Sequence, residues 1–457
     1  MFEGCVRSAS SVLCSAGLVL ALASPWQSAG GHEHHAPKIN SDVFTLTKQH
    51  APTPLPDRVV LTWSDDPTKT VNVTWRTAAG VYGPRAEYAP ADSLKGNLVT
   101  GYVPHADKVE GNTSPFASNL GTYLVHSVKL KGLKPGTMYA YRVGDGHHWS
   151  EWHQFRTASE KPEPFSFVYF GDAQNAIRSM WSRVIREASQ HAPRAAFMLH
   201  AGDLVNSGDN DAEWGEWFQA GGWLNGMIPT VAAPGNHEYP DSPAGTEEHL
   251  TTHWRPQFAF PLNGPEGLEE TTYWFDYQGA RIVSLNSNER QAEQAAWLDQ
   301  LLQHQDRPKW TIVTFHHPIY SAAKERDNPQ LRSLWGPILE RHGVDLVLQG
   351  HDHAYARSGL GGPKNNVAEG VRNKASNTVY VVSVSGPKMY TLQEKWEVSR
   401  VACGIQLFQV IHVAPEGIRY EARTASGERY DGFTLTKDDV GVSTLTEEIP
   451  ATAEVRE

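Results

Sequence analysis

Short runs of alternating apolar and polar residues occupy the chain between residues 57 and 158. They include the segments 59–63, 70–75, 123–128 and 138–143, which are separated by turn-forming residues. A period of two turns one face of a strand toward a core and the other toward solvent. The pattern therefore predicts an antiparallel, all-β sandwich. Because no catalytic residue types cluster there, we expect a non-catalytic module, with Trp63, Trp75, Trp149 and Trp152 serving core and edge packing rather than forming a ligand platform for a surface polymer.

The pattern changes after Pro164, where apolar strands alternate with amphipathic helices. The predicted strands are 165–170, 195–199, 228–233, 281–285, 310–315 and 344–349, and the predicted helices include 179–190 and 291–303. This alternation is typical of an α/β domain, which we place at residues 163–436, with its functional loops following the strands along one sheet edge. Later runs at 379–384, 406–412 and 417–422 predict a second sheet.

The two ends of the chain lack these patterns. Residues 1–29 hold Arg7, an apolar stretch and then small residues, which predicts a signal peptide and an exported, periplasmic or secreted protein without a transmembrane segment after cleavage. Residues 30–56 predict a linker, in which His32, His34 and His35 are either a solvated tail or a weak metal-capture site. The acidic residues 437–457 predict a disordered tail.

Composition narrows the class of protein and of partner. The 457 residues are 40% hydrophobic and 20% charged, which suits globular domains with buried cores. A formal net charge of −11 offers no basic surface, so we expect no nucleic acid as a sequence-specific partner. Only Cys403 remains after signal removal, so no internal disulfide is expected. The sequence leaves the oligomeric state open.

Five short polar segments each follow a predicted strand. They are Gly171-Asp172, Gly202-Asp203-Leu204-Val205-Asn206, Gly235-Asn236-His237-Glu238, His316-His317-Pro318 and Gly350-His351-Asp352-His353. Any one of them alone suits a turn, a loop or a buried histidine pair. Together they supply carboxylate and amide oxygens and imidazole nitrogens, which suit two adjacent divalent or trivalent ions. The conjunction therefore predicts a dinuclear metal site at one rim of the sheet.

The order of these segments resembles that of a known family. With the flanking runs Trp310 to Pro318 and Gly350 to Arg357, it is similar to the purple acid phosphatase branch of the calcineurin-like metallophosphoesterases. The resemblance extends over residues 57–430, and segment 133–139 resembles the turn and tyrosine of fibronectin type III domains. It implies a four-layer sandwich of two mixed sheets flanked by helices, preceded by a fibronectin type III-like domain.

The resemblance also implies roles for individual residues. Asp172 and His353 would bind the first metal, and Asp203 would bridge both ions. Asn236, His316 and His351 would complete the second site, and the metals would be iron paired with zinc, manganese or iron. His237 would be the catalytic histidine that contacts the phosphate or the leaving group. His317 and Tyr355 are candidates for lining the substrate pocket, although His317 suits a packing role equally well.

Two positions depart from the family pattern. Asn206 stands where the purple branch has a tyrosinate ligand, and Gln174 stands where the wider superfamily has a histidine. The first metal then lacks its usual fourth protein ligand, and Gln174, Asn206 or water would take the place through oxygen. Without phenolate there is no charge transfer to iron, so we predict a colourless or pale protein.

The resulting expectation is an acid phosphatase that cleaves small phosphomonoesters by attack of metal-bound hydroxide. One alternative is a phosphodiesterase or nucleotide hydrolase with the same site. A second alternative, from a different class, is a non-catalytic surface binding protein with a decayed site. The complete order of the six expected ligands argues against decay.

Overall fold

The computed structural model describes residues 45–94, 106–240, 249–304, 306–365 and 377–456. The predicted signal peptide and the histidines of the predicted linker lie outside these residues. Leu46–Glu457 form one compact unit, which is the part considered below. No helix among the described residues has the length and apolar character needed to cross a bilayer.

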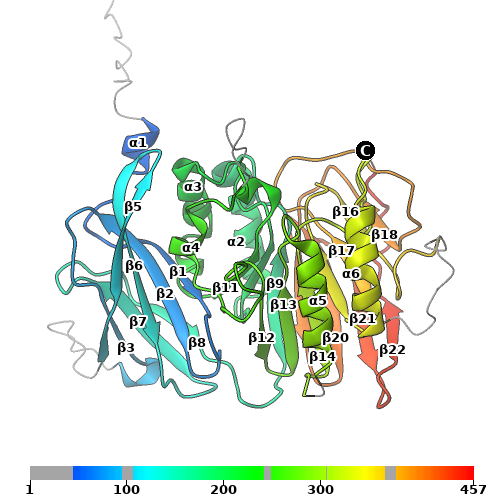
Figure 1. Ribbon diagram of the computed structural model, residues 1–457, viewed down its shortest axis with the longest axis horizontal. Helices are drawn as coiled ribbons and strands as arrows, with labels where there is room; N and C mark the ends of the chain where they lie inside the picture. The colour runs from blue at the N-terminus through cyan, green and yellow to red at the C-terminus, as the bar shows by residue number, and fades with distance from the viewer. Residues whose placement is uncertain (1–44, 95–105, 241–248, 305, 366–376, 457) are drawn as a thin grey trace, which may run out of the picture. The chain divides into compact units, whose positions relative to one another are not determined.

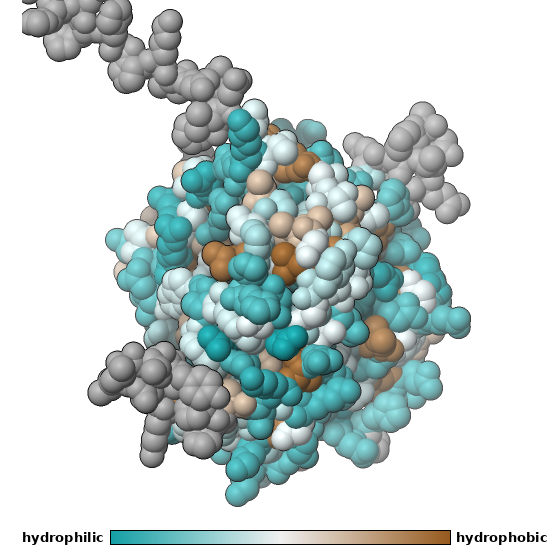
Figure 2. Space-filling view, turned by 90° about the vertical axis from the view of Figure 1, so that its left-hand side faces the viewer, coloured by the Kyte–Doolittle hydropathy of each residue, from teal (hydrophilic) through white to brown (hydrophobic). Residues whose placement is uncertain are grey.

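The N-terminal part of this unit is a β-sandwich of two antiparallel sheets (Figure 1). One sheet runs in the order β1 (Asp57–Thr62), β2 (Val71–Ala78), β6 (Gly121–Leu130), β5 (Asn112–Ser118), and the other β4 (Asp107–Glu110), β3 (Arg85–Pro90), β7 (Met138–Gly144), β8 (His153–Arg156). Trp63 and Trp75 are buried, as expected, whereas Trp149 and Trp152 are half-buried and flank the Arg142 guanidinium. The face drawn in Figure 2 is largely hydrophilic, with hydrophobic residues scattered over it.

Two mixed sheets form the centre of the larger domain. The first runs β11 (Thr230–Ala233), β10 (Met198–Ala201), β9 (Phe165–Phe170), β19 (Leu407–Val413), β20 (Gly417–Thr424), β21 (Arg429–Lys437), β22 (Ser443–Glu447). The second runs β12 (Tyr273–Tyr277), β13 (Ala280–Ser284), β14 (Trp310–Thr314), β15 (Leu346–Gln349), β17 (Val379–Val382), β16 (Tyr355–Arg357), β18 (Arg400–Ala402). Strands β9 to β11 are mutually parallel, as are β13, β14, β15 and β17.

Helices cover the outer faces of both sheets and complete four layers. Successive residues of the second sheet alternate between two cores: Leu346 and Leu348 join the core shared with the first sheet, whereas Val347 joins the core that contains α5 and α6. The helices are α2 (Ser182–His191), α3 (Asp211–Gly221), α5 (Gln291–Leu302) and α6 (Pro329–Arg341), with short α1 (Leu46–Gln49) and α4 (Trp254–Gln257). Figure 1 shows α5 and α6 side by side. The predicted fold class is confirmed. The predicted membership of the second sheet is corrected in part, because β17 lies in that sheet whereas β19 and β20 join β9 in the first sheet.

A buried charge cluster joins the sandwich to the larger domain. Asp211, the first residue of α3, accepts hydrogen bonds from Arg58 Nη1 at 2.6 Å and from the Tyr123 hydroxyl at 2.8 Å. The Tyr141 hydroxyl donates to the Gly226 carbonyl at 2.6 Å. These groups are almost inaccessible to solvent, so the two domains share one continuous polar and apolar interior.

The end of the chain corrects one expectation. We predicted a disordered tail from residue 437, but β22 pairs with β21 in antiparallel register. Arg357, which is fully buried, donates to Glu447 Oε2 at 2.7 Å, and the Val455 carbonyl accepts a hydrogen bond from the backbone of Cys403. Acidity alone was misleading, because Glu447 compensates the buried charge of Arg357.

Candidate metal centre

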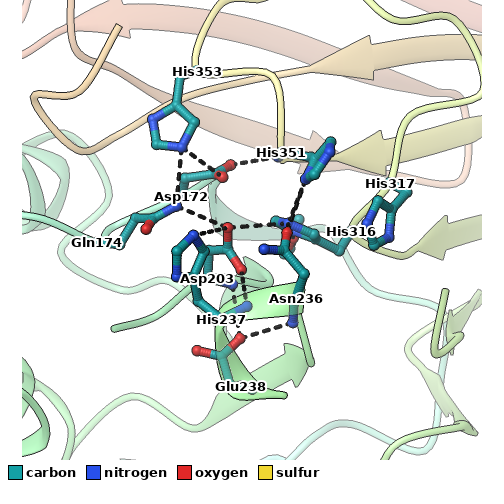
Figure 3. A network of polar contacts seen from close by, with 12 residues as sticks. Asp172, Gln174, Asp203, Asn236, His237, Glu238, His316, His317, His351 and His353 are labelled. Carbon is teal, nitrogen blue, oxygen red and sulfur yellow. Dashed lines mark hydrogen bonds and ion pairs between the residues drawn. The ribbon is translucent and has the colours of Figure 1, made fainter. Parts of the chain in front are cut away.

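The polar segments converge at the carboxyl ends of the central strands. Asp172 follows β9, Asp203 follows β10, and Asn236 lies in the turn after β11. His316 follows β14 of the second sheet, and the segment with His351 and His353 follows β15. Figure 3 shows the side chains of these six residues pointing toward one another. The two sheets thus deliver their ligand candidates to a single rim, because parallel strands end at a common edge.

The backbone of these loops is tightly constrained. Gly202 has φ +88°, and a Cβ at this position would lie 2.6 Å from His316 Nδ1. Asp203, His351 and His353 also have positive φ values of 52°, 74° and 46°. Such conformations cost a non-glycine residue about 1–3 kcal/mol and tend to gather at functional sites. The strained backbone at these three residues therefore lowers the stability of the fold and directs their side chains toward the centre.

Two groups of donor atoms share one carboxylate. The first donor group is Asp172, Asp203 and His353, and the second donor group is Asp203, His316 and His351; within each, the donor atoms lie within 4.8 Å of one another. Asn236 joins the second donor group, since its Oδ1 lies 3.0 Å from His351 Nδ1 and 3.1 Å from His316 Nε2. Asp203 is therefore the carboxylate that the two donor groups have in common.

Hydrogen bonds outside the donor groups set the orientation of two histidines. His316 Nδ1 donates to the Ala201 carbonyl at 2.9 Å, and His353 Nδ1 donates to the Lys388 carbonyl at 2.9 Å. Each ring consequently turns Nε2 toward the centre, and this nitrogen can bind metal when it carries no proton. Asp172 Oδ1 is buried and has no hydrogen-bond partner among the described residues. This donor set fits a pair of cations.

Electrostatics at the centre also favours a bound cation. Burial, reinforced by the neighbouring charge of Asp203, raises the pKa of Asp172 to about 8. Burial opposes ionisation of Asp203 as well, but the adjacent His316 holds the pKa of that carboxyl below its usual range. The pKa of His316 in turn rises to about 9, because the pull of Asp203 outweighs burial. A proton or a cation is thus required to balance two carboxylates buried together.

His237 and His317 border the donor groups without belonging to either. His237 Nδ1 donates to the Asn206 carbonyl at 2.6 Å, while its Nε2 lies 3.9 Å from Asp203 Oδ2. The side chain is 27% exposed, so Nε2 is open to an incoming molecule. His317 Nδ1 pairs with Ser287 Oγ at 2.8 Å, and burial lowers the pKa of His317 to about 3. His317 is therefore a neutral side chain at the wall of the site.

The two unusual positions differ in what they contact. Asn206 Oδ1 accepts a hydrogen bond from Asn175 Nδ2 at 2.8 Å, so its amide is engaged outside the donor groups. The Gln174 side chain is fully buried, and its Nε2 lies 2.8 Å from Asp203 Oδ2 and 2.9 Å from His353 Nε2. Of the two, only Gln174 reaches the first donor group in the contacts of the described residues.

Tyr355 corrects another expectation. We predicted that it lines the substrate pocket, but its side chain is fully buried on β16. Its hydroxyl donates to Asp431 Oδ2 at 2.6 Å and lies 3.2 Å from the Tyr420 hydroxyl. The residue therefore belongs to the core between the two sheets. Proximity in sequence to His353 was misleading, because β16 alternates its side chains away from the rim.

Glu238 is a site residue that the sequence motif contained but that received no role. Its carboxylate is buried and accepts hydrogen bonds from the backbone of Asp203 at 2.9 Å, Leu204 at 2.9 Å and Gly235 at 2.7 Å. These bonds hold the Asp203 loop against the Asn236 loop. Its position in Gly235-Asn236-His237-Glu238, three residues after a glycine turn, was the available signal.

Arg326 and Tyr390 also border the site and were not predicted. Arg326 Nη1 donates to the His351 carbonyl at 3.0 Å, and its guanidinium lies 4.6 Å from the centre of the Tyr390 ring. That ring lies 4.7 Å from the ring of His353. No sequence signal marked either residue, because each lies in a loop without a motif and contacts a candidate ligand residue of the site.

Comparison with protein families matches most of the two domains. Residues 56–157 match the family model described as purple acid phosphatase, N-terminal domain. Residues 143–355 match the model described as calcineurin-like phosphoesterase. Together these matches take in the sandwich and the loops that carry all six candidate metal ligands.

Similar proteins include phosphatases from plants and animals. Over 348 residues the chain is 25% identical to purple acid phosphatase 15 of Arabidopsis thaliana, which covers 66% of this chain and 64% of that protein. It is 29% identical to purple acid phosphatase 21 of Arabidopsis thaliana over 60% of this chain and 63% of that protein. It is 26% identical to acid phosphatase type 7 of Mus musculus over 68% and 72% of the respective chains. The chain thus spans slightly less than two thirds of the plant relatives.

Solved structures share the fold. Purple acid phosphatase PPD1 from seeds of yellow lupin superposes with a TM-score of 0.69 at 19% identity, covering 84% of this chain and 75% of that one. PhoD superposes with a TM-score of 0.62 at 13% identity, covering 89% and 94%. At such identities the superpositions establish the architecture of the molecule.

Proposed function

The chain belongs to the purple acid phosphatase-like branch of the calcineurin-like phosphoesterases, and from this premise we propose that it hydrolyses phosphate esters at a dinuclear metal centre. The observation that carries the proposal is Asp203, which belongs to both donor groups. A carboxylate between two sets of donors is the arrangement that holds two ions at the short separation of about 3.5–4 Å used in phosphoryl transfer.

Six side chains would hold the ions. They are Asp172, Asp203 and His353 for the first and Asp203, Asn236, His316 and His351 for the second. When bound, the ions would lower the pKa of water and neutralise charge on the phosphate during in-line attack. We propose iron paired with zinc, manganese or iron; the mixture of hard oxygens and imidazoles is compatible with each pair.

We assign the role of catalytic side chain to His237. The Asn206 carbonyl fixes the proton on Nδ1, so Nε2 faces the space above Asp203. In its imidazolium form, which carries a second proton on Nε2, the ring can donate a hydrogen bond to a phosphoryl oxygen or deliver that proton to the departing alkoxide. His317, held by Ser287, would define the neighbouring wall and stay uncharged while substrate binds.

The substrate that we propose is a small phosphomonoester. His237 and Arg326, which border the donor groups, are both partly exposed, and a net charge of −11 gives no extended basic surface for a larger polyanion. A phosphodiester or a nucleotide would use the same residues and is the alternative. We also retain export to the periplasm or the exterior as a proposal. The convergence of all six candidate ligands argues against a purely binding role with a decayed site.

Metal analysis combined with a substrate screen tests the proposal. The purified chain should contain two metal ions and hydrolyse para-nitrophenyl phosphate faster than bis(para-nitrophenyl) phosphate. Removal of metal by a chelator should abolish turnover, and readdition should restore it. Two bound ions without hydrolysis of either ester, or hydrolysis that survives complete metal removal, would overturn it.

A further inference from the structure

The side chain of Gln174 lies inside the first donor group. It follows Asp172 by two residues in the loop after β9, and its accessible surface is zero. Its Nε2 lies 2.8 Å from Asp203 Oδ2 and 2.9 Å from His353 Nε2. Figure 3 shows this carboxamide between the two ligand candidates. The amide hydrogens therefore point at the lone pairs that a cation would use.

The other end of the carboxamide is left without a bond. Gln174 Oε1 is buried and has no hydrogen-bond partner among the described residues, and the same holds for Asp172 Oδ1 in the same donor group. A buried amide oxygen without a partner costs about 1–3 kcal/mol. A half turn about the Cγ–Cδ bond exchanges Nε2 and Oε1 within an unchanged volume. It would bring the unpartnered oxygen to the place between Asp203 and His353.

We propose that Gln174 is the fourth protein ligand of the first metal and binds it through Oε1. A cation held by Asp203 and His353 repels the amide hydrogens, so the half turn accompanies metal binding. The inference rests on the dinuclear function proposed above. Asn206 is not needed for it, because the Asn206 amide already bonds to Asn175.

This ligand changes the preference of the first site. Asp172, Asp203 and Gln174 give three oxygens and His353 one nitrogen, whereas the second site has two oxygens and two imidazoles. Hard oxygen ligands favour Mn²⁺ or Mg²⁺, and imidazole favours Zn²⁺. A neutral amide in place of a phenolate also removes the negative charge that stabilises a ferric ion. We therefore expect the first site to prefer a divalent ion, and use Mn²⁺ as the probe of the first site and Zn²⁺ as the probe of the second.

The competing arrangement makes a different prediction. If the amide keeps its hydrogens toward Asp203 and His353, it occupies the first site itself. The protein would then bind one ion, at the second donor group. The number of metal ions bound per chain therefore distinguishes a Gln174 that binds the first ion from a Gln174 that occupies its site.

The test is metal titration of the metal-free full-length chain. One equivalent of Zn²⁺ is added first. Mn²⁺ is then titrated in, and its binding is measured by calorimetry and by its electron paramagnetic resonance signal. The wild type should bind one Mn²⁺ beside one Zn²⁺. Gln174→Leu should weaken Mn²⁺ binding by at least about tenfold and leave Zn²⁺ binding unchanged, and Gln174→Glu should tighten it, since it supplies a charged oxygen. Asn206→Ala is the matched control and should bind both ions as the wild type does.

Two outcomes would overturn the inference. They are a single bound ion in the wild type, or unchanged Mn²⁺ affinity in both Gln174 variants, with circular dichroism confirming that each variant is folded. Failure here is distinguishable from failure of the proposed function. A wild type that binds two ions through Gln174 but cleaves no phosphate ester would refute the function alone, whereas an active enzyme indifferent to Gln174 would refute the ligand alone.

Discussion

Glu238 accepts a hydrogen bond from the backbone N–H of Asp203 at 2.9 Å, so the loop that carries the shared carboxylate is held by the loop that carries Asn236 and His237. The same carboxylate also accepts from Leu204 and Gly235. Ligands from two strands are thereby fixed relative to each other before any cation arrives. Hydrogen bonds that orient the residues around a metal site in this way typically raise its affinity for metal.

Glu238→Gln should weaken metal binding by about 10- to 100-fold. The amide retains one acceptor oxygen, but its NH₂ group faces backbone donors and leaves them unsatisfied, which should also cost about 1–3 kcal/mol of stability. Metal affinity by calorimetry and chemical denaturation measure the two effects. Glu293→Gln, at an exposed ion pair with Arg290, is the control and should change neither. Full metal affinity in Glu238→Gln would show that the loop is held by other contacts.

Asp203→Asn should strip at least one metal ion from the protein. The substitution removes the charge that serves both donor groups while preserving volume. Elemental analysis after dialysis should give one ion or none per chain. Asp209→Asn, an exposed position in the same loop, should keep both. Retention of two ions by Asp203→Asn would contradict a bridging role.

His237→Ala should lower turnover by about 10²- to 10⁴-fold while metal content stays at the wild-type value. The reason is that Nε2 faces the open side of the site, whereas the ring makes no contact with the ligand nitrogens His316 and His351 in the interactions of the described residues. Steady-state kinetics and metal analysis on the same sample separate the two effects. Equal loss of metal and turnover would reassign His237 as a ligand.

The iron-loaded protein should be colourless or pale. Asn206 supplies no phenolate, and its side chain is bonded to Asn175. Charge transfer from tyrosinate to iron is therefore absent. The visible spectrum checks this, and an intense purple band would show that a tyrosine from elsewhere in the chain reaches the ion.

Asp211 should make the stability of the metal-free protein fall steeply in acid. Burial tends to raise the pKa of this carboxyl, but His253, Arg58 and Tyr123 together lower it well below the ordinary value. A lowered folded-state pKa contributes stability above the unfolded value of about 3.9, and this is lost as pH falls through the folded value. Most of this loss should appear below about pH 4, so unfolding is measured from pH 7 down to pH 2.

The variant Asp211→Asn should flatten that acid limb and cost about 3–5 kcal/mol at pH 7, because Arg58 then remains buried without its anion. Asp299→Asn, at a surface pair with Arg341, should cost about 1 kcal/mol or less. If the two variants lose similar stability, the interdomain cluster is no stronger than a solvated pair.

Much of this site could be predicted because the signals for its residues lie in short stretches of sequence. Asp172, Asp203 and His316 each follow an apolar strand, and parallel strands deliver such residues to one edge whatever the rest of the fold does. Glu238, Arg326 and Tyr390 act through backbone groups or rings of residues distant in sequence, which no local pattern encodes. The prediction that Tyr355 lines the substrate pocket was wrong for a related reason. His351 and His353 lie at the rim of the sheet, but Tyr355 begins β16 and its side chain points toward Asp431.

The cluster around Asp211 has a consequence for how the two domains can evolve. Asp211 opens α3, and Glu213 in the first turn of that helix accepts the backbone N–H of Asn206, which in turn supports His237. Arg58 and Tyr123 of the sandwich thus stand four links away from His237, the side chain proposed to be catalytic. A recombination event that replaced the sandwich without preserving these two positions would disturb the contacts that support His237. The two domains are therefore expected to be inherited as a pair.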